Sequence, residues 1–362
     1  MEVPRQRLRV GIRIPPSRPL PEIAALAKVA EDAGFDTVAI PDSPALMRDT
    51  IACLCLAAIE TSTVTLATGV TNLVTRSPML LASAIRTVAD LAPGRLRIGI
   101  GAGDSAVNLT GQKPASTEAL REGVASLSAL LLGQEIGPGG SMVLNDPPGP
   151  IPVYLAANRP RNIALAAEVA DGLITNPRGI SQAFRIVDTI VTQQHRDRAF
   201  QRATSILTCV TEDVEREARR MKPKIANHLR RDGQAMLEES GYTVEIPSGH
   251  IPLPDGSDLG HPRDWDAAVE IASQWISDDL ALWYVDRFML FGTGEEIYRR
   301  LVHLAYLGVD EVICEHPYSL ELPSELIADL GTVVIPRLRD PAPSSLRDSH
   351  LTEGTAAAPK TA

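Results

Sequence analysis

The feature that most constrains this chain is a regular alternation of short β-rich runs with amphipathic helical segments. The run LRVGIRI (8–14) predicts a strand, and apolar residues between Ile23 and Ala30 then follow the i, i+3, i+4, i+7 spacing of one helix face. That helix ends at Gly34, after which DTVAIPD (36–42) predicts a second strand. Strands and helices that alternate in this way form a parallel sheet covered by the helices.

The same strand–helix unit repeats along most of the chain. Further strands are predicted over 64–70, 95–103, 152–158, 172–176, 205–210 and 310–315. Further helices are predicted over 47–60, 78–91 and 117–132, in an alanine-rich segment that ends at Ala170, between 184 and 237 around the strand at 205–210, and over 295–306. An open doubly wound sheet alternates in the same way, but eight units favour closure into a (β/α)8 TIM barrel.

The predicted barrel occupies one domain, residues 1–339. Two stretches interrupt the repeat: a Gly/Pro-rich excursion at 136–150, and a segment at 241–263, dense in Gly, Pro and Asp, that reads as an irregular insertion or lid. The segment 340–362 has too few apolar residues to fold, so we expect a disordered C-terminal tail.

Charge and composition exclude several classes of partner. The net charge of -10 and the absence of a basic run argue against nucleic-acid binding. No apolar stretch reaches the roughly 18 to 20 residues of a membrane span, and the N-terminus runs straight into a strand without a signal peptide, so we expect a cytoplasmic protein. The four cysteines lack metal-site or CxxC spacing, which predicts buried apolar residues and no metal site.

In such a barrel, chemistry belongs at the carboxyl ends of the strands. The second predicted strand ends at Asp42, and the fourth ends in a glycine-rich turn in which Gly103 precedes Asp104. The third ends in the run Thr68, Gly69, Val70, Thr71 and Asn72, and the fifth in Ala156, Ala157, Asn158 and Arg159. The last group precedes a helix N-terminus, which is a natural seat for a phosphate.

Each of these signals also has a structural explanation. Asn158 is a candidate N-cap, Asp42 is a candidate turn residue, and Asp104 could cap its turn through backbone N–H groups. Arg13, at the end of the first strand, could meet an anionic substrate or pair with a carboxylate.

Other polar and aromatic residues give weaker signals. We expect solvent-facing histidines at His195, His228, His303 and His350, and packing roles for Trp265, Trp275 and Trp283. His250 and His261, in the predicted lid, could reach a substrate.

Three segments carry a resemblance to a known family. They are TGVTNLVTRSPMLLASAIRTVADLAPGRLRIGIGAGDSAVNLTGQKPAS (68–116), YLAANRPRNIALAAEVADGLIT (154–175) and VDRFMLFGTGEEIYRRLVHLAYLGVDEVI (285–313). The chain resembles luciferase-like oxidoreductases, and within them the methylenetetrahydromethanopterin reductase branch, which uses coenzyme F420.

The resemblance implies a flavin or deazaflavin ring in the barrel mouth. It places a bulge with a non-prolyl cis peptide at Gly69–Val70 behind the ring, Asp42, Thr68, Thr71 and Asn72 around its edge, Gly103 and Asp104 beside it, and the residues from Ala156 to Arg159 on the phosphate side. Many relatives carry a His after the strand-two Asp, whereas this chain has Ser43, so its proton donor must differ. The resemblance also implies a homodimer or higher oligomer.

Three functions remain open at this point. The first is a deazaflavin (coenzyme F420)-dependent oxidoreductase that moves hydride to or from a small organic substrate, with Asp104 and Asp42 as candidate catalytic carboxylates. The second is a monooxygenase that uses reduced FMN and oxygen. The third is a non-catalytic flavin-binding relative. The fold serves all three, so the fold does not decide between them.

Overall fold

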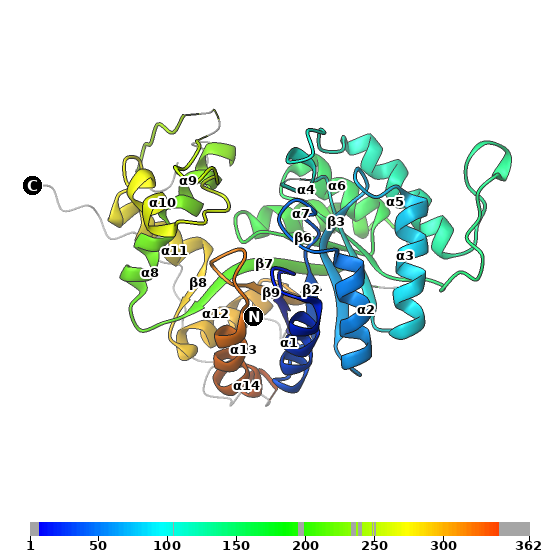
Figure 1. Cartoon of the computed structure of the whole chain (residues 1–362), viewed down its shortest axis with the longest axis horizontal. Coiled ribbons are helices and arrows are strands. Elements are labelled where there is room, and N and C mark those ends of the chain that lie inside the picture. Colours follow the sequence, from blue (N-terminus) through cyan, green and yellow to red (C-terminus); the bar gives the residue numbers. More distant parts are fainter. Residues whose placement is uncertain are drawn as a thin grey trace, which may run out of the picture.

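Eight parallel strands close into a barrel, as predicted. A computed structural model describes residues 7–339, except 104, 195–198, 233–236, 238–240, 248 and 250. Neighbouring strands pair in the order β6-β5-β4-β3-β2-β1-β9-β7, and pairing of β6 with β7 closes the ring. Figure 1 shows helices such as α1, α2 and α3 on the outside of these strands. The barrel strands are β1 (Arg9–Arg13), β2 (Thr37–Ile40), β3 (Thr65–Asn72), β4 (Leu96–Gly101), β5 (Val153–Ala156), β6 (Gly172–Thr175), β7 (Gln201–Val210) and β9 (Glu311–Glu315).

Helices surround the barrel, and several begin where the sequence offers a capping side chain. Asp49 accepts a hydrogen bond from the Ala52 N–H and starts a helix three residues later than the predicted Met47, because an N-cap residue satisfies the first free N–H groups. The outer helices are α1 (Leu20–Asp32), α2 (Thr50–Glu60), α3 (Pro78–Leu91), α4 (Ser105–Asn108), α5 (Thr117–Leu131), α6 (Pro160–Val169), α7 (Ile180–Val191), α12 (Gly294–Tyr306), α13 (Ser324–Asp329), the π-helical η3 (Leu330–Val334) and α14 (Ile335–Arg339). A 3-10 turn, η1 (Pro138–Gly140), lies in the excursion at 136–150.

One strand, β8 (Leu290–Gly292), was not predicted. It pairs in parallel with the last three residues of β7, Thr208–Val210, beyond the part of β7 that pairs with β9. Three residues are too few to show the alternating pattern that predicts a strand. The extended conformation of β8 therefore depends on its hydrogen bonds to β7. The predicted strand at 205–210 in turn begins earlier, at Gln201, where the chain pairs with β6.

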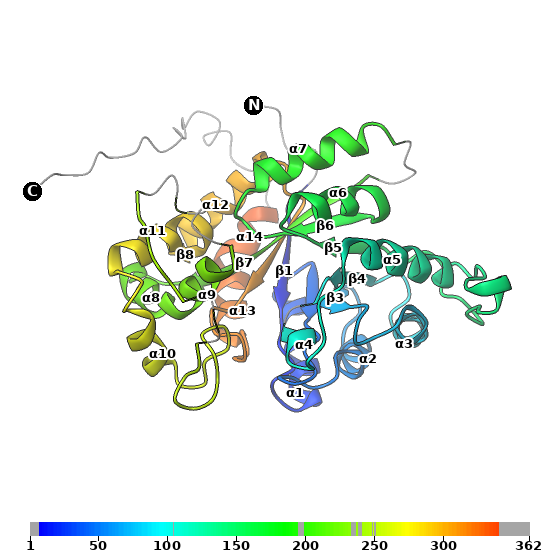
Figure 2. The same ribbon diagram turned by 90° about the horizontal axis from the view of Figure 1, so that it is seen from above.

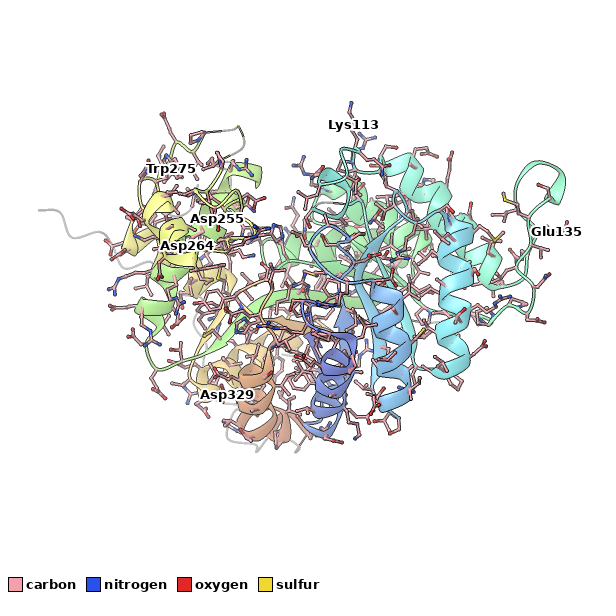
Figure 3. All side chains as sticks on the ribbon, viewed as in Figure 1. Lys113, Glu135, Asp255, Asp264, Trp275 and Asp329 are labelled. Carbon is pink, nitrogen blue, oxygen red and sulfur yellow. The ribbon has the colours of Figure 1, made fainter. Side chains whose placement is uncertain are left out.

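A helical insertion lies between β7 and β8 and is wider than the predicted lid. Its helices are α8 (Val214–Arg220), α9 (Lys222–Asp232), α10 (Trp265–Ala272) and α11 (Asp278–Phe288). They share a hydrophobic cluster separate from the main core, and the three tryptophans pack against it. Figure 3 shows Asp255, Asp264 and Trp275 together in this insertion, while Glu135 lies on the loop at the opposite end of the molecule.

The barrel interior is narrow at the amino ends of the strands and hollow at the carboxyl ends. Alternate strand residues point inward. Near the amino ends, Arg97 of β4 forms a buried ion pair with Glu311 of β9 and lies 4.6 Å from the ring centre of Tyr154. Above this pair the inward residues are small, with Ala39 and Ala67 packed on Ile313. The small residues leave space for a cavity at the barrel mouth.

Two predictions concern regions that the structure does not describe. The predicted disordered tail, 340–362, lies outside the described residues, as do His195, His250 and His350.

Within the described part of the chain, no helix has the length and apolar character needed to cross a bilayer.

Candidate active site

A cavity of about 420 Å³ opens at the carboxyl ends of the barrel strands. Its walls come from β1, β3, β5, β6, β7 and β9, and two helices of the insertion, α9 and α11, cover it from the other side. Its volume lies within the range of roughly 300–1,000 Å³ that small-molecule sites occupy. The position is where the sequence predicted the site.

The bulge of β3 forms one wall of this cavity. The Gly69–Val70 peptide is cis, and the register between β3 and β4 shifts between Thr68 and Thr71. The family resemblance predicted both features at this position. Both Gly69 and Val70 line the cavity, so the bulge presents backbone and a short apolar side chain to any ligand.

Glycines make room for the bulge. A Cβ atom at Gly99 would lie 2.4 Å from the Thr68 carbonyl oxygen and 3.0 Å from Val70 Cγ1. A Cβ atom at Gly69 would lie 2.7 Å from the Cβ of Ala39. The glycines of strand four therefore serve the packing of strand three, a use that the sequence analysis did not anticipate.

The polar residues on either side of the bulge are hydrogen-bonded within the protein. The Thr68 hydroxyl donates to the Gly99 carbonyl and accepts from the Gly99 N–H, which ties β3 to β4. Asn72 Oδ1 accepts from the N–H groups of Val74 and Thr75, whereas its Nδ2 is buried with no hydrogen-bond partner in the described part of the chain. The Asn72 Nδ2 group is therefore a buried donor that none of the described residues uses, whereas the Thr68 hydroxyl is fully engaged by the Gly99 backbone.

Asp42 is buried in an ion pair beside the cavity. Its Oδ2 accepts hydrogen bonds from the Thr71 hydroxyl at 2.7 Å and from Arg76 Nε at 2.8 Å. Arg76 also pairs with Asp49, whose pKa it lowers against the opposing effect of burial. Neither Asp42 nor Thr71 lines the cavity, so the structure gives both a place in a support network.

The glycine-rich turn after β4 requires a glycine at Gly103. Its φ is +100°, a value that favours glycine, and a Cβ there would lie 2.3 Å from Val107 Cγ2. Ser43 lies close to this turn, with its hydroxyl 3.3 Å from that of Ser105. Asp104 comes between Gly103 and Ser105 in the sequence, and it lies outside the described residues.

Residues at the end of β5 have two different roles, since some line the cavity and others are bonded within the sheet. Ala156 lines the cavity, but Ala157 is buried and its N–H donates to the Ile174 carbonyl, so it does not offer a free donor to a phosphate. Asn158 Oδ1 accepts a hydrogen bond from the Asn176 N–H, and the N-cap of α6 is Arg159 rather than Asn158. Asn158 lines the cavity, and Arg159 lines a hollow beside it.

The cover of the cavity contains a polar group that the sequence analysis missed. Tyr284 of α11 accepts a hydrogen bond from Arg178 Nη1 at 3.0 Å, and its oxygen lies 3.3 Å from His228 Nδ1. Because a guanidinium only donates, the phenol hydrogen is available to the imidazole. His228 was expected to face solvent, but it lines the cavity one helical turn after the buried Lys224. That expectation was wrong, because the insertion turns this face of α9 toward the barrel.

The opposite wall of the cavity carries one more ion pair. Arg13 Nη1 lies 3.7 Å from Glu315 Oε2, and Ser205 donates to the other oxygen of Glu315. Arg13 therefore both lines the cavity and pairs with a carboxylate, which combines the two alternatives that its position left open.

The cysteines are poorly suited to act as nucleophiles. Burial raises the pKa of Cys53 and of Cys209 to about 11, and that of Cys314 to about 12. Thiols with such values stay protonated at neutral pH. Among the described residues, no group of three or more His, Cys, Asp or Glu side chains is placed to hold a metal ion.

The structure thus brings part of the predicted site together. Of the predicted residues, Gly69, Val70, Ala156 and Asn158 line the cavity, while Asp42, Thr68, Thr71, Asn72, Gly103 and Ala157 do not. Arg178 follows strand six, where the strand-end rule could have found it. His228 and Tyr284 had no such signal, because their helices belong to the insertion.

Comparison with known proteins agrees with this geometry. The family described as luciferase-like monooxygenase matches residues 7–311. The 5,10-methylenetetrahydromethanopterin reductase of Archaeoglobus fulgidus is 27% identical, covering 92% of this chain and all of the relative. The F420-dependent glucose-6-phosphate dehydrogenase of Beutenbergia cavernae is 32% identical, covering 46% of this chain and 56% of the relative. The solved coenzyme F420-dependent tetrahydromethanopterin reductase of Methanopyrus kandleri superposes with a TM-score of 0.68 at 22% identity, over 92% of this chain and all of that one, which shows the shared fold.

Proposed function

The chain belongs to the luciferase-like monooxygenase family, and from this premise we propose that it is a coenzyme F420-dependent oxidoreductase. It would transfer hydride between the deazaflavin and a small organic substrate at the barrel mouth. The observation that carries this proposal is the cavity between the β3 bulge and the helical insertion, which opens into a hollow lined by arginines. Two relatives whose names include F420 dependence support the choice of cofactor.

The residues of the cavity fit a deazaflavin. The bulge at Gly69–Val70 offers a backing for the ring without a long side chain. Asn158 and Arg159 lie on the side toward the arginines, where the anionic end of the cofactor would sit. When bound, the deazaflavin supplies two-electron hydride chemistry without ready reaction with oxygen.

The chain's own residues would position the substrate and hold a proton. Asp104 remains our proposed acid, because it follows the glycine turn at Gly103. Asp42 remains a candidate acid, but its ion pair with Arg76 supports a role in holding the site. His228 and Tyr284 provide a second route, since they face the cavity in place of the imidazole that Ser43 does not supply.

A titration of the purified protein with coenzyme F420 and, separately, with FMN tests the proposal. We expect the deazaflavin to bind with a dissociation constant at least about tenfold below that of FMN, a difference of roughly 1.4 kcal/mol. Tight binding of FMN with no binding of the deazaflavin would support the monooxygenase alternative that the family description suggests. Binding of neither would support a non-catalytic role.

A further inference from the structure

Three polar side chains lie together on one side of the cavity at the barrel mouth. Arg13 of β1, Glu315 of β9 and Ser205 of β7 all line the cavity. Their strands are neighbours in the order β1-β9-β7, so the three side chains lie side by side. We call Arg13, Glu315 and Ser205 the polar wall.

The polar wall lies opposite the bulge of β3. In the closed ring of eight strands, β3 and β7 are four places apart in either direction. Figure 2 shows the insertion helices α8 to α11 on the side of the barrel where β7 and β8 lie, away from α2 and α3 (Figure 2). A ring that rests on Gly69–Val70 would therefore leave the polar wall across the cavity from it, with space for a substrate between them.

Arg13 is the member of the polar wall with unused donors. Its side chain is only 19% exposed, and its Nη1 lies 3.7 Å from Glu315 Oε2, which is beyond hydrogen-bond distance. Within the described part of the chain, the Arg13 guanidinium makes no hydrogen bond, whereas the Ser205 hydroxyl donates one to Glu315 Oε1. Because a guanidinium carries five N–H donors, Arg13 can bind a ligand without giving up its ion pair.

The surroundings of Arg13 favour a negatively charged ligand. Glu315 is the only carboxylate among the described residues that line the cavity, although the chain as a whole has a net charge of -10. Arg178 and Lys224 add basic side chains to the lining, and both bind protein groups, the Tyr284 oxygen and the Gly260 carbonyl respectively. An incoming anion would therefore meet Arg13 with only one carboxylate to oppose it.

Geometry and charge favour a carboxylate over a phosphate. A guanidinium binds a planar carboxylate through two parallel hydrogen bonds. Glu315 stays close to the same guanidinium and would repel a second negative charge, so a monoanion fits better than a phosphate dianion. Leu207, Met289 and Ile313 supply apolar lining, which suits a short carbon chain.

We propose that Arg13 binds the carboxylate of the substrate, so that the substrate is a small carboxylic acid whose reacting carbon lies between the polar wall and the bulge. This inference rests on the proposed function and deepens it, because it names the class of substrate. Arg13 determines which substrate binds and takes no part in proton transfer.

Calorimetry of the full chain tests the preference for a carboxylate. Butyrate, lactate and 3-hydroxybutyrate are each titrated beside the corresponding neutral amide, with and without coenzyme F420, and ethyl phosphate serves as the dianion. We expect at least one acid to bind about tenfold more tightly than its amide and than ethyl phosphate.

Three outcomes would overturn this proposal: amides that bind as tightly as the acids, tighter binding of ethyl phosphate, or no binding of any acid. The affinity for coenzyme F420 is measured separately on the unmodified chain. Any of the three outcomes would therefore leave the proposed function standing.

Variants of Arg13 locate the effect. Arg13→Gln should weaken binding of the acid by on the order of tenfold and leave the affinity for its amide within about twofold. Arg13→Lys keeps the charge but loses the paired hydrogen bonds, so it should retain part of the preference.

Arg48→Gln is the matched control for charge. Arg48 is exposed in the connection between β2 and α2, at the same end of the barrel, and it does not line the cavity. Both affinities should therefore stay within about twofold. Equal losses in Arg13→Gln and Arg48→Gln would reveal a long-range effect of charge and would overturn the assignment.

Glu315→Gln separates ligand binding from a purely structural ion pair. If the pair only holds the wall, Arg13→Gln and Glu315→Gln should lower the melting temperature alike without changing the preference for the acid. We instead expect Glu315→Gln to keep or strengthen binding of the acid, and to raise the affinity for ethyl phosphate by about threefold or more, because a repelling charge is removed. A loss of acid binding equal to that in Arg13→Gln would contradict the proposal.

Discussion

Single polar side chains in this site divide between those that face the cavity and those that hold its walls. Hydrogen bonds within the protein engage Thr68, Thr71 and Asp42. By contrast, His228 and Tyr284 face the cavity. A buried polar group without a hydrogen-bond partner lowers the stability of the folded protein. Replacing a side chain that supports the cavity walls would leave its buried partner unpaired, so we expect such a substitution to be destabilising. Two predictions concern individual residues, namely Asp42, which supports a wall, and Asp104, our proposed acid.

The first concerns Asp42. Asp42→Asn removes the buried charge that Arg76 and Thr71 bind, so we expect the free energy of unfolding to fall by about 1–3 kcal/mol. Asp49→Asn is the control, because it weakens a more exposed ion pair with the same Arg76 and keeps an N-cap side chain for α2. Urea denaturation measures both. Equal effects of the two variants would argue against a supporting role for Asp42.

The second concerns Asp104. If it is the acid of the site, Asp104→Asn should lower turnover by about 10²–10⁴ while cofactor affinity changes little, because the variant keeps the shape and removes the titrating proton. The assay uses a substrate found by screening small alcohols, aldehydes and imines with the deazaflavin. Near-normal turnover would instead assign proton transfer to His228 and Tyr284, or to water.

At the level of elements, the β3 bulge depends on its neighbours. The bulge forms only because β2 and β4 present small residues to it, namely Ala39 and Gly99. The insertion matters equally, because α9 and α11 carry the side chains that cover the cavity. The cavity is therefore assembled from strands and from two helices that lie far apart in the chain.

Gly99→Ala tests the dependence of the bulge on β4. The added Cβ would clash with the Thr68 carbonyl at 2.4 Å, so we expect a loss of about 1–3 kcal/mol in unfolding free energy and weaker binding of the deazaflavin chromophore. Gly249→Ala is the control, because a Cβ there meets nothing within 4 Å. Unchanged stability and binding in Gly99→Ala would show that the bulge can shift without cost.

For the whole molecule, the buried ion pair of Arg97 and Glu311 joins strands from opposite ends of the chain, 214 residues apart. Removing Arg97 leaves the buried Glu311 carboxylate with only the ion pair to Arg9 Nη2, 3.5 Å away. We expect Arg97→Met to cost about 3–5 kcal/mol, and the double variant Arg97→Met/Glu311→Leu to recover most of that loss. Chemical denaturation of the single and double variants checks this. An additive loss in the double variant would contradict it.

The same pair predicts how stability depends on pH. Burial acts to raise the pKa of Glu311, but Arg97 and Arg9 outweigh it and hold the pKa below its ordinary value. The stabilisation is therefore fully present above the ordinary carboxyl pKa of roughly 4.3, and it is lost as pH falls through the lower value of the folded state. Denaturation of the native chain below about pH 4.5 should show this loss, and the double variant should show less of it.

The sequence by itself determined the strand–helix alternation, the closed barrel and the end of the barrel at which the cavity opens, because these follow from local periodicity and from the parallel arrangement of the strands. The position of the β3 bulge came from the resemblance to a known family, which the sequence also carries. The tertiary structure alone decided that Asp42 binds Arg76, that strand-four glycines accommodate the bulge, and that the three residues of the polar wall lie side by side. It also decided that His228 faces the cavity beside Tyr284, 56 residues away. Such contacts depend on how distant elements pack, and no local pattern records that.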